Sequence, residues 1–540
     1  MGSISRDEID VDLVVVGGGP TCLLAGYLCQ QLGVNVCILA VDAKAAPLAI
    51  GRADALNART QQYLEVVGIL DELLPEGITC NASSTFADGE FKSRQSHWWT
   101  SLKHTHRKDF LMLGQPLVEK ALSSRMKSPV LYGEHVTSIN EGDEDVVIET
   151  SGGRMIRSRY VVGADGARST VRTALGINFT GTKPEMTWAV LDTFIDTDFH
   201  VCSEIVTFQL NQESRVAWFP RERDLARFYV LLEGEITEER AKESIRAHMA
   251  PHRVDFVWTE WFSTFEGRGR VRLAGDAAHV HSVNGGQGLN TGIADAFGLA
   301  WRLAYVLTNK TANKTAAQDL IKSYDTERRV VAQGVIDVAA TLVRETVRTA
   351  KSYVSAIERN AGYISMGVSY DGIGSKLIHD SSVGIWTAGH RCPDLYLMPT
   401  LDAEAKRLYS LLSYGRHLIL HVGRPESRAG GVANRAISDG VARAFRVLPR
   451  PEDAEAHADV SPGIEVFWAN WVRPTDNYVV IVRPDLYVGF VEDDSQEWRN
   501  YLSYLTIRHS ALAEAHQLWV LAVSLYCTSR NLSAHFETAL

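Results

Sequence analysis

VDLVVVGGGPTCLLAGYL, residues 11–28, is the stretch that decides the fold. Its first six residues are apolar apart from one aspartate, which predicts a buried strand, and the run stops at three glycines and a proline. Leucines and a tyrosine then recur at helical spacing, so a helix should follow the turn. A second buried strand is expected over 36–41, after Gly33 ends the helix. This strand, helix, strand unit is typical of an α/β fold with a parallel sheet.

The glycines of this turn suit a dinucleotide. Gly17 allows the tight turn, and Gly19 lets the backbone approach a pyrophosphate at the positive end of the helix. The pattern departs from GxGxxG in two places, because Cys22 stands at the third glycine position and the acid that would bind a ribose is displaced from Ala40 to Asp42. A plain strand-to-helix turn is the alternative, so other motifs must decide.

Composition narrows the class of protein. A chain of 540 residues predicts two or three domains, and a net charge of −10 argues against nucleic acid or an anionic membrane surface as a partner. The polar, acidic start does not predict a signal peptide, and no apolar run reaches the length of a transmembrane helix. Seven scattered cysteines without metal-binding spacing indicate a reducing compartment, with neither zinc nor a disulfide framework. We therefore expect a cytoplasmic protein that binds a small molecule.

Four further segments make the prediction specific. They are GRADALNART at 51–60, GQPLVEKAL at 114–122, YVVGADGARSTVR at 160–172 and RVRLAGDAAHVHSVNGGQGLNTGIADA at 270–296. In this order they resemble the class A flavoprotein monooxygenases, the p-hydroxybenzoate hydroxylase superfamily, and most closely its phenol hydroxylase-like branch. The resemblance implies bound FAD. No second glycine-rich turn follows a later strand, so NAD(P)H would visit the flavin without a Rossmann domain of its own.

The motifs supply candidate cofactor residues with a physical role. Asp276, presented by Gly275 at a strand end, can accept hydrogen bonds from the ribityl hydroxyls of FAD. Gly286 and Gly288 allow the backbone to pass against a flat ring, where the helix expected to start near Asn290 directs its positive end. Arg52 and Gln115 enter by resemblance, and Asp165 has helix capping as an alternative role. The candidate cofactor residues are Gly17, Gly19, Asp42, Arg52, Gln115, Asp165, Gly166, Gly275, Asp276, Gly286, Gln287, Gly288, Leu289 and Asn290.

The resemblance also implies the domain organisation. A Rossmann-like FAD-binding domain would comprise residues 1–180 and 267–385, and an inserted β-sheet substrate domain would comprise 181–266. Residues 386–502 resemble the thioredoxin-like C-terminal domain of the phenol hydroxylase branch, without its own CxxC, and 503–540 stay unassigned. That domain serves packing or dimer contact in the family, so a homodimer is an assembly to test.

One stretch departs from the family. Phenol hydroxylase relatives carry an active-site arginine shortly before the strand that leads to the GDAAH motif, but here Glu266 runs straight into Gly267. Either another residue replaces this arginine, or a coding segment was lost, or the enzyme is impaired. Aromatic residues of the inserted sheet could line a pocket for a ring or form plain core: Trp188, Trp218, Phe219, Trp258 and Trp261.

Asp54 is the candidate catalytic residue. By resemblance it stands where the phenol hydroxylase branch keeps an acid near the substrate hydroxyl, and a carboxylate can help to remove a phenolic proton. Its alternative role is a helix N-cap. The expected function is FAD-dependent hydroxylation of a phenol-like or polyketide-derived aromatic substrate with NAD(P)H and dioxygen, as in fungal aromatic degradation and secondary metabolism. Epoxidation or dearomatising hydroxylation of a natural product, and a degenerate flavin-binding protein without turnover, stay open.

Overall fold

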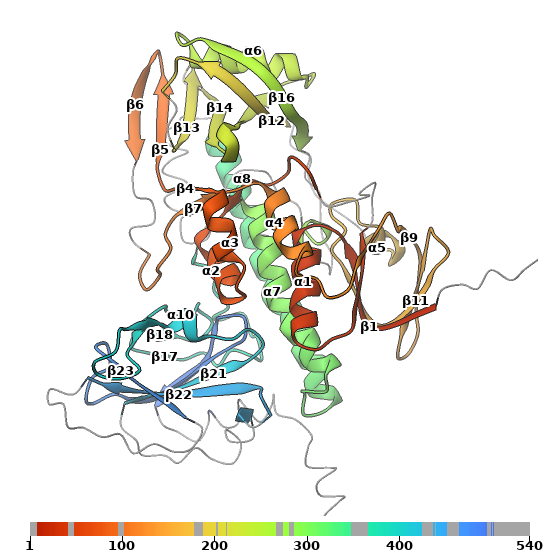
Figure 1. Ribbon diagram of the computed structural model, residues 1–540, viewed down its shortest axis with the longest axis vertical. Helices are drawn as coiled ribbons and strands as arrows, with labels where there is room; N and C mark the ends of the chain where they lie inside the picture. Colours follow the sequence, from red (N-terminus) through yellow and green to blue (C-terminus); the bar gives the residue numbers. More distant parts are fainter. Residues whose placement is uncertain are drawn as a thin grey trace, which may run out of the picture.

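The structure is a computed structural model. It describes residues 8–40, 48–95, 102–177, 187–200, 203–211, 213–265, 274–279, 286–346, 366–423, 436–437, 439–450, 464–493, 498 and 501. Figure 1 shows a mixed α/β architecture, in which three larger sheets surround a central group of helices.

The first sheet contains the N-terminal unit. Among the described residues six strands form it, in the order β8 (Val130–Tyr132), β2 (Val36–Ala40), β1 (Glu8–Gly17), β11 (Met155–Gly163), β10 (Val146–Thr150) and β9 (Val136–Glu141). β1 pairs in parallel with β2 and β11. Leu13 and Val15 belong to the core that includes α1, whereas Val14 and Val16 pack with Val171 on the opposite face. A strand covered on both faces requires apolar side chains throughout, which explains the VDLVVV run.

Helices α1 (Pro20–Gln31), α7 (Gln287–Leu307) and α8 (Lys314–Thr346) form the centre of the molecule in Figure 1. α1 and α7 pack closely together, and nearly all residues of both are buried. None of the described helices has the length and apolar character needed to cross a membrane. The remaining helical segments are α2 (Ala58–Val66), α3 (Leu70–Leu73), α4 (Gln115–Ser123), α5 (Thr170–Ala174), α6 (Glu238–Met249), α10 (Leu408–Leu411), and the 3-10 turns Leu74–Glu76, Glu222–Asp224 and Gly275–Ala277.

The second sheet contains strands of residues 187–265, from the segment 181–266 that is predicted to be the substrate domain; the substrate role stays a prediction. In the described part of the chain seven strands form this sheet, in the order β16 (Val254–Phe265), β12 (Thr187–Thr197), β15 (Ala226–Leu232), β14 (Glu213–Pro220), β13 (Ile205–Leu210), β5 (Ser83–Ala87) and β6 (Glu90–Gln95). Two features go beyond the sequence analysis. Helix α6 packs on this sheet through Ala241, Ile245 and Met249. The strands β5 and β6 come from the segment expected to belong to the cofactor domain, and β5 pairs in parallel with β13.

The third sheet lies in the C-terminal region. Its described strands have the order β23 (Glu465–Ala469), β22 (Ala442–Pro449), β21 (His417–Gly423), β24 (Asn477–Val482) and β25 (Val488–Asp493). The first three are mutually parallel, and β24 is antiparallel to β21. The thioredoxin-like character and the domain boundaries stay predictions. Short strands complete the description: β3 (Ala55–Leu56), β4 (Ile78–Cys80), β7 (Phe110–Met112), β17 (Ser382–Val383), β18 (Trp386–Thr387), β19 (Tyr396–Leu397) and β20 (Lys406–Arg407).

Candidate active site

The turn between β1 and α1 has room for a ligand on one side only. A Cβ added at Gly17 would lie 2.3 Å from the carbonyl oxygen of Ala164, so glycine is required by close packing of β1 against the end of β11. Gly19 is the N-cap of α1, and a Cβ added there would meet no heavy atom within 4 Å. The N-cap of α1 therefore borders open space, as the approach of a pyrophosphate to this helix end would require.

Cys22 and Thr21 explain how this turn tolerates its unusual sequence. Cys22 is fully buried, and its thiol lies 3.8 Å from the carbonyl oxygen of Val15. Thr21 fits between two glycines, because a Cβ at Gly275 or Gly292 would come within 2.8 or 2.3 Å of its hydroxyl oxygen. Thr21 thus joins α1 to both the GDAAH turn and α7, a role that the sequence analysis missed. The glycine at 292, one turn into α7, was the available signal.

The GDAAH turn is held by a buried carboxylate from α7. Asp295 accepts hydrogen bonds from the backbone N–H of Gly275 at 2.9 Å and from Nε of Arg328 at 2.6 Å, and it contacts Nε2 of His279 at 2.8 Å. Burial alone would raise the pKa of Asp295, but Arg328 and His279 lower it to about 2. Asp276, in contrast, is exposed. The neighbouring groups therefore fix the backbone while the Asp276 carboxylate stays accessible to a ligand.

The N-terminus of α7 is tied to the segment that carries Asp54. Gly286 caps the helix in the left-handed conformation (φ +62°), so α7 begins at Gln287 rather than near Asn290. The Asn290 side chain accepts from the backbone N–H of Asn57 at 3.0 Å and donates to the carbonyl of Ala55 at 3.0 Å. A Cβ at Gly286 would meet nothing within 4 Å, so the backbone here also borders open space. Gln287 and Leu289 are buried, and Gly288 is half-buried beside Asp276.

Arg52 and Gln115 occupy different environments. Arg52 is exposed with φ +69°, and its carbonyl oxygen accepts a hydrogen bond from the Arg227 guanidinium. Gln115, the first residue of α4, accepts from the backbone N–H of Ala53 at 3.3 Å and donates to Glu119 at 2.8 Å. Gln115 therefore supports the 51–57 segment, whereas the Arg52 side chain is free to reach a ligand.

Asp165 and Gly166 lie at the start of α5. The Asp165 carboxylate accepts hydrogen bonds from the backbone N–H groups of Thr170 at 2.7 Å and Val171 at 3.1 Å, and from the Ser169 hydroxyl at 2.5 Å. This is the helix-capping role. Gly166 has φ +77°, which favours glycine. Asp42, the remaining candidate, lies outside the described residues.

Asp54 belongs to the 51–57 segment and is buried against strand β15 of the second sheet. It does not cap α2, because Asn57 takes that position by accepting from the backbone N–H of Thr60 at 2.9 Å. The Asp54 carboxylate accepts a hydrogen bond from the Tyr229 hydroxyl at 3.1 Å and lies 3.4 Å from Nη1 of Arg227. Burial and the nearby Asp54 charge raise the pKa of Tyr229, so its hydroxyl stays a donor.

Arg227 forms its main ion pair with another carboxylate, that of Asp192. Its Nε and Nη2 atoms donate to the two Asp192 oxygens, both at 2.5 Å, in a fully buried bidentate pair across β12 and β15. Arg221 lies 3.7 Å from Asp192 and forms a bidentate pair with Glu222. We call Asp54, Asp192, Arg221, Glu222 and Arg227 the sheet cluster. Its three carboxylates exceed its two guanidiniums by one, and Asp54 is the carboxylate with the weakest neutralisation.

An aromatic side chain closes this region. The Trp261 ring lies under the Arg227 guanidinium at 5.3 Å, and a Cβ at Gly51 would come within 2.6 Å of that ring. The other candidate aromatics differ: Trp188 and Trp218 are core, Phe219 packs on Tyr229, and Trp258 is 59% exposed. Trp261, which contacts Arg227, and Phe219, which packs on Tyr229, are therefore the candidates next to the partners of Asp54.

Comparisons with known proteins agree with this geometry. Residues 10–339 match the FAD binding domain family, which is more than half of the chain. The chain belongs to the class A flavoprotein monooxygenases. It is 27% identical over 541 residues to a phenol 2-monooxygenase of Aspergillus fumigatus, covering 92% of this chain and 87% of the relative. It is 28% identical over 445 residues to a rifampicin monooxygenase of Streptomyces venezuelae, covering 76% and 87%.

Solved structures share the fold of this monooxygenase. Aklavinone-11 hydroxylase, crystallised with FAD and aklavinone, aligns with a TM-score of 0.72 at 22% identity, covering 92% of this chain and 99% of that one. The flavin-dependent monooxygenase PieE, in complex with FAD and substrate, aligns with a TM-score of 0.71 at 18% identity, covering 92% and 98%.

The replacement of the family's active-site arginine by another residue stays a prediction. Residues 266–273, where the family's stretch would lie, are outside the described residues. Arg227 nevertheless places a guanidinium beside Asp54 from the middle of β15. The sequence analysis missed Arg227, Tyr229 and Asp192. The available signal was charged residues within apolar strands, LDT at 191–193 and ARFYVLL at 226–232.

Proposed function

We propose that this monooxygenase hydroxylates a phenol-like or polyketide-derived aromatic substrate, with FAD as its bound cofactor and NAD(P)H and dioxygen as co-substrates. The observation that carries the proposal is Asp54, a carboxylate of the 51–57 segment that is buried against the second sheet and is only partly neutralised. Such a group can accept a proton from a phenol in a site from which water is excluded.

FAD would be held by backbone that borders open space. Gly19 and the first turn of α1 would receive the pyrophosphate, Asp276 the ribityl hydroxyls, and the Gly286–Gly288 backbone the flat ring. Arg52 is exposed and available to the same ligand. When bound and reduced by NAD(P)H, FAD supplies the activation of dioxygen.

The protein prepares the substrate. Asp54 would take the phenolic proton, which makes the ring a better nucleophile, while the Tyr229 hydroxyl orients the carboxylate. Arg227 partly stabilises the buried negative charge of Asp54. It does not form a bidentate ion pair with Asp54, because that contact is made with Asp192. Trp261 and the sheet would keep water away. The similarity to a phenol 2-monooxygenase supports a substrate with a phenolic ring.

The first experiment tests whether the oxidation of NADPH or NADH is coupled to oxygenation of an aromatic substrate. The purified protein, loaded with FAD, is mixed with NADPH or NADH and a panel of phenols and polyketide-derived aromatics, and oxidation of the nicotinamide is followed together with product mass. A gain of one oxygen atom at the rate of nicotinamide oxidation supports the proposal. Oxidation that yields only hydrogen peroxide with every substrate would support the degenerate protein, and an epoxide product would support the alternative reaction.

A second experiment tests the FAD site alone. Gly19 has an ordinary φ of −87°, so Gly19→Ala adds a methyl group to open space without backbone strain. We expect the thermal stability of the apoprotein to be retained and the affinity for FAD to fall. Gly298→Ala, within α7, is the matched control, since its Cβ would make an ordinary 3.5 Å contact with Arg302. Equal FAD affinity in both variants would show that the pyrophosphate does not bind at the turn before α1.

A further inference from the structure

A second group of buried charges lies between the central helices and the C-terminal region. It joins α2, α7, α8 and the turn 483–487, and none of its members is more than 7% exposed. We call it the helix cluster, and its members are Arg59, Asp295, Arg302, Glu327, Arg328, Arg483 and Asp485. Four guanidiniums face three carboxylates, so the cluster has one surplus positive charge.

Three of the four arginines have carboxylate partners. Arg483 donates to both Glu327 oxygens at 2.8 Å and to Asp485 at 3.0 Å. Arg302 pairs with Glu327 at 2.7 Å and Asp485 at 3.2 Å. Arg328 pairs with Asp295 at 2.6 Å. The surplus charge therefore belongs to Arg59.

Arg59 has only neutral partners among the described residues. Nη1 donates to Gln62 at 3.0 Å and the Tyr409 hydroxyl at 3.2 Å, and Nη2 donates to the carbonyls of Asp485 and Leu486. The guanidinium also lies 4.5 Å from the Tyr63 ring and 4.8 Å from the Tyr487 ring. No carboxylate of the described chain lies within 4.0 Å of it, and its Nε is buried without a hydrogen-bond partner. A buried cation in this state requires a counter-charge.

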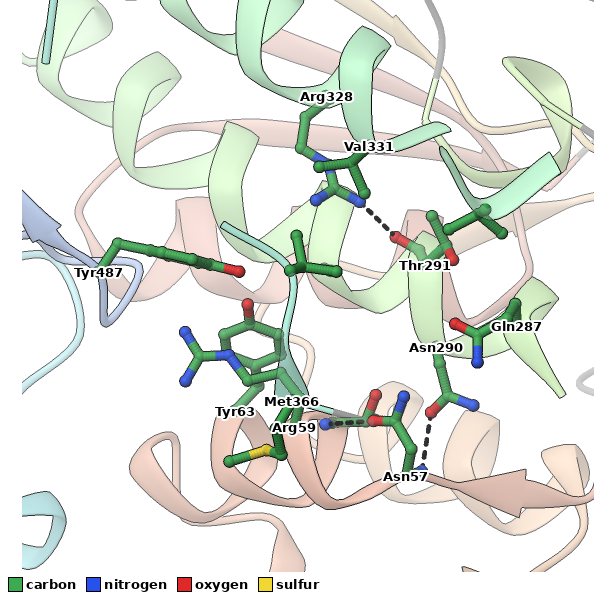
Figure 2. Close-up of a pocket in the computed structure, with 14 residues that line it drawn as sticks. Asn57, Arg59, Tyr63, Gln287, Asn290, Thr291, Arg328, Val331, Met366 and Tyr487 are labelled. Carbon is green, nitrogen blue, oxygen red and sulfur yellow. Dashed lines mark hydrogen bonds between the residues drawn. The ribbon is translucent and has the colours of Figure 1, made fainter. Parts of the chain in front are cut away.

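A small cavity borders Arg59. Its volume is about 30 Å³, and Arg59, Arg328, Asn290 and Thr291 are among its lining residues (Figure 2). The first turn of the 21-residue helix α7 contributes to the lining, so its positive end adds to the field of Arg59. About 30 Å³ is the space of one small ion or of roughly one to two waters.

We propose that this cavity binds one small monovalent anion of the halide class, which neutralises Arg59. The anion would lie beside Arg59 and Arg328, which both line the cavity. Asn57 and Asn290 line the same cavity and are hydrogen-bonded to each other, next to the predicted flavin-binding backbone. Halide occupancy therefore stabilises the junction between α2 and α7. This inference concerns a cavity separate from Asp54 and does not depend on the proposed reaction.

Crystallography with bromide tests the site directly. Crystals of the FAD-loaded protein are soaked in sodium bromide, and anomalous difference maps are compared between the wild type and Arg59→Met, which removes the charge at similar volume. We expect a bromide peak in the cavity of the wild type and none in the variant. A wild-type cavity that holds only water, or a peak that persists in Arg59→Met, overturns the proposal.

Stability in solution provides the second measurement. At constant ionic strength, replacing gluconate by chloride or bromide should raise the Tm of the wild-type holoprotein and leave that of Arg59→Met unchanged. Arg59→Lys keeps a cation and should keep part of the halide response, which covers the case in which Arg59→Met fails to fold. Arg253→Met, at an exposed arginine, is the control and should respond as the wild type does. Identical responses in all four proteins contradict a specific site.

Discussion

The sheet cluster and the helix cluster bury the same kinds of side chain with opposite charge balance. In the sheet cluster the Asp192–Arg227 and Arg221–Glu222 pairs are bidentate, and the carboxylate left over is Asp54. In the helix cluster Glu327 and Asp485 are saturated by Arg302 and Arg483, and the group left over is Arg59. Asp192–Arg227 joins β12 to β15, and Glu327 joins α8 to α7 and to the turn 483–487, whereas the surplus group of each cluster is the one that we propose to meet a ligand.

The largest effect is expected at the surplus carboxylate. Asp54→Asn removes the proton acceptor, and we expect hydroxylation to slow by about 10²–10⁴-fold while FAD stays bound. Product formation under saturating NADPH measures the rate, and the flavin spectrum measures cofactor content. Asp198→Asn, at an exposed position directly after β12, is the matched control and should retain the wild-type rate. A rate for Asp54→Asn within a factor of two of the wild type would exclude Asp54 as the base.

The second effect concerns a saturated carboxylate. Glu327→Gln leaves Arg302 and Arg483 to share Asp485, so the free energy of unfolding should fall by about 3–5 kcal/mol. Urea unfolding of the FAD-loaded protein measures it. Glu239→Gln, at an exposed glutamate of α6, should change stability by at most about 1 kcal/mol. An equal decrease in the free energy of unfolding in the two variants would show that the buried ion pairs of Glu327 contribute no more to stability than an exposed pair does.

A smaller effect is expected at Tyr229, and its size shows whether this residue orients Asp54 or itself transfers a proton. Tyr229→Phe removes one hydrogen bond to Asp54 and should lower kcat/KM by up to about tenfold, corresponding to about 0.5–1.5 kcal/mol. Because the pKa of Tyr229 is raised, its loss should leave the basic limb of the pH profile unchanged. Steady-state kinetics from pH 6 to 9 would check both statements. A loss as large as that of Asp54→Asn would instead make Tyr229 a proton carrier.

The smallest effect is expected for an exposed ion pair, which tests whether ion pairing without burial contributes to stability. Arg253 contacts Asp196 and Asp255, but all three side chains are more than half exposed. Arg253→Ala should change the free energy of unfolding by about 0–1 kcal/mol. Thermal unfolding at low and high salt is the measurement. A loss comparable to that of Glu327→Gln would contradict the weight that we give to burial.

The sequence predicts the FAD-binding unit far better than it predicts the sheet cluster. The FAD-binding unit could be inferred because its signals are local: a β-branched run, glycines at a turn, and a following helix. Asp54 was reached only through resemblance to a family, and its partners Arg227 and Tyr229 lie 173 and 175 positions later in the chain. Asp192 meets Arg227 through the register of β12 and β15, which no local pattern encodes.

The helix cluster is still less accessible to sequence reasoning. Glu327 and Arg328 make buried ion pairs with Arg302, Arg483 and Asp295. The unbalanced charge of Arg59, however, follows only from counting partners in three dimensions. In GRADALNART this arginine looks like any other helix residue. A charge surplus is a property of the packed molecule and has no signature in spacing or composition.

The parallel pairing of β5 with β13 sets a condition for protein engineering. A chimera that exchanges residues 187–265 between relatives would separate five strands from the β5–β6 hairpin, which is contributed by residues 83–95. The graft would then expose the unpaired edge of β13, a known cause of aggregation. Exchanges intended to alter substrate choice should therefore transplant both segments together, as a single discontinuous module.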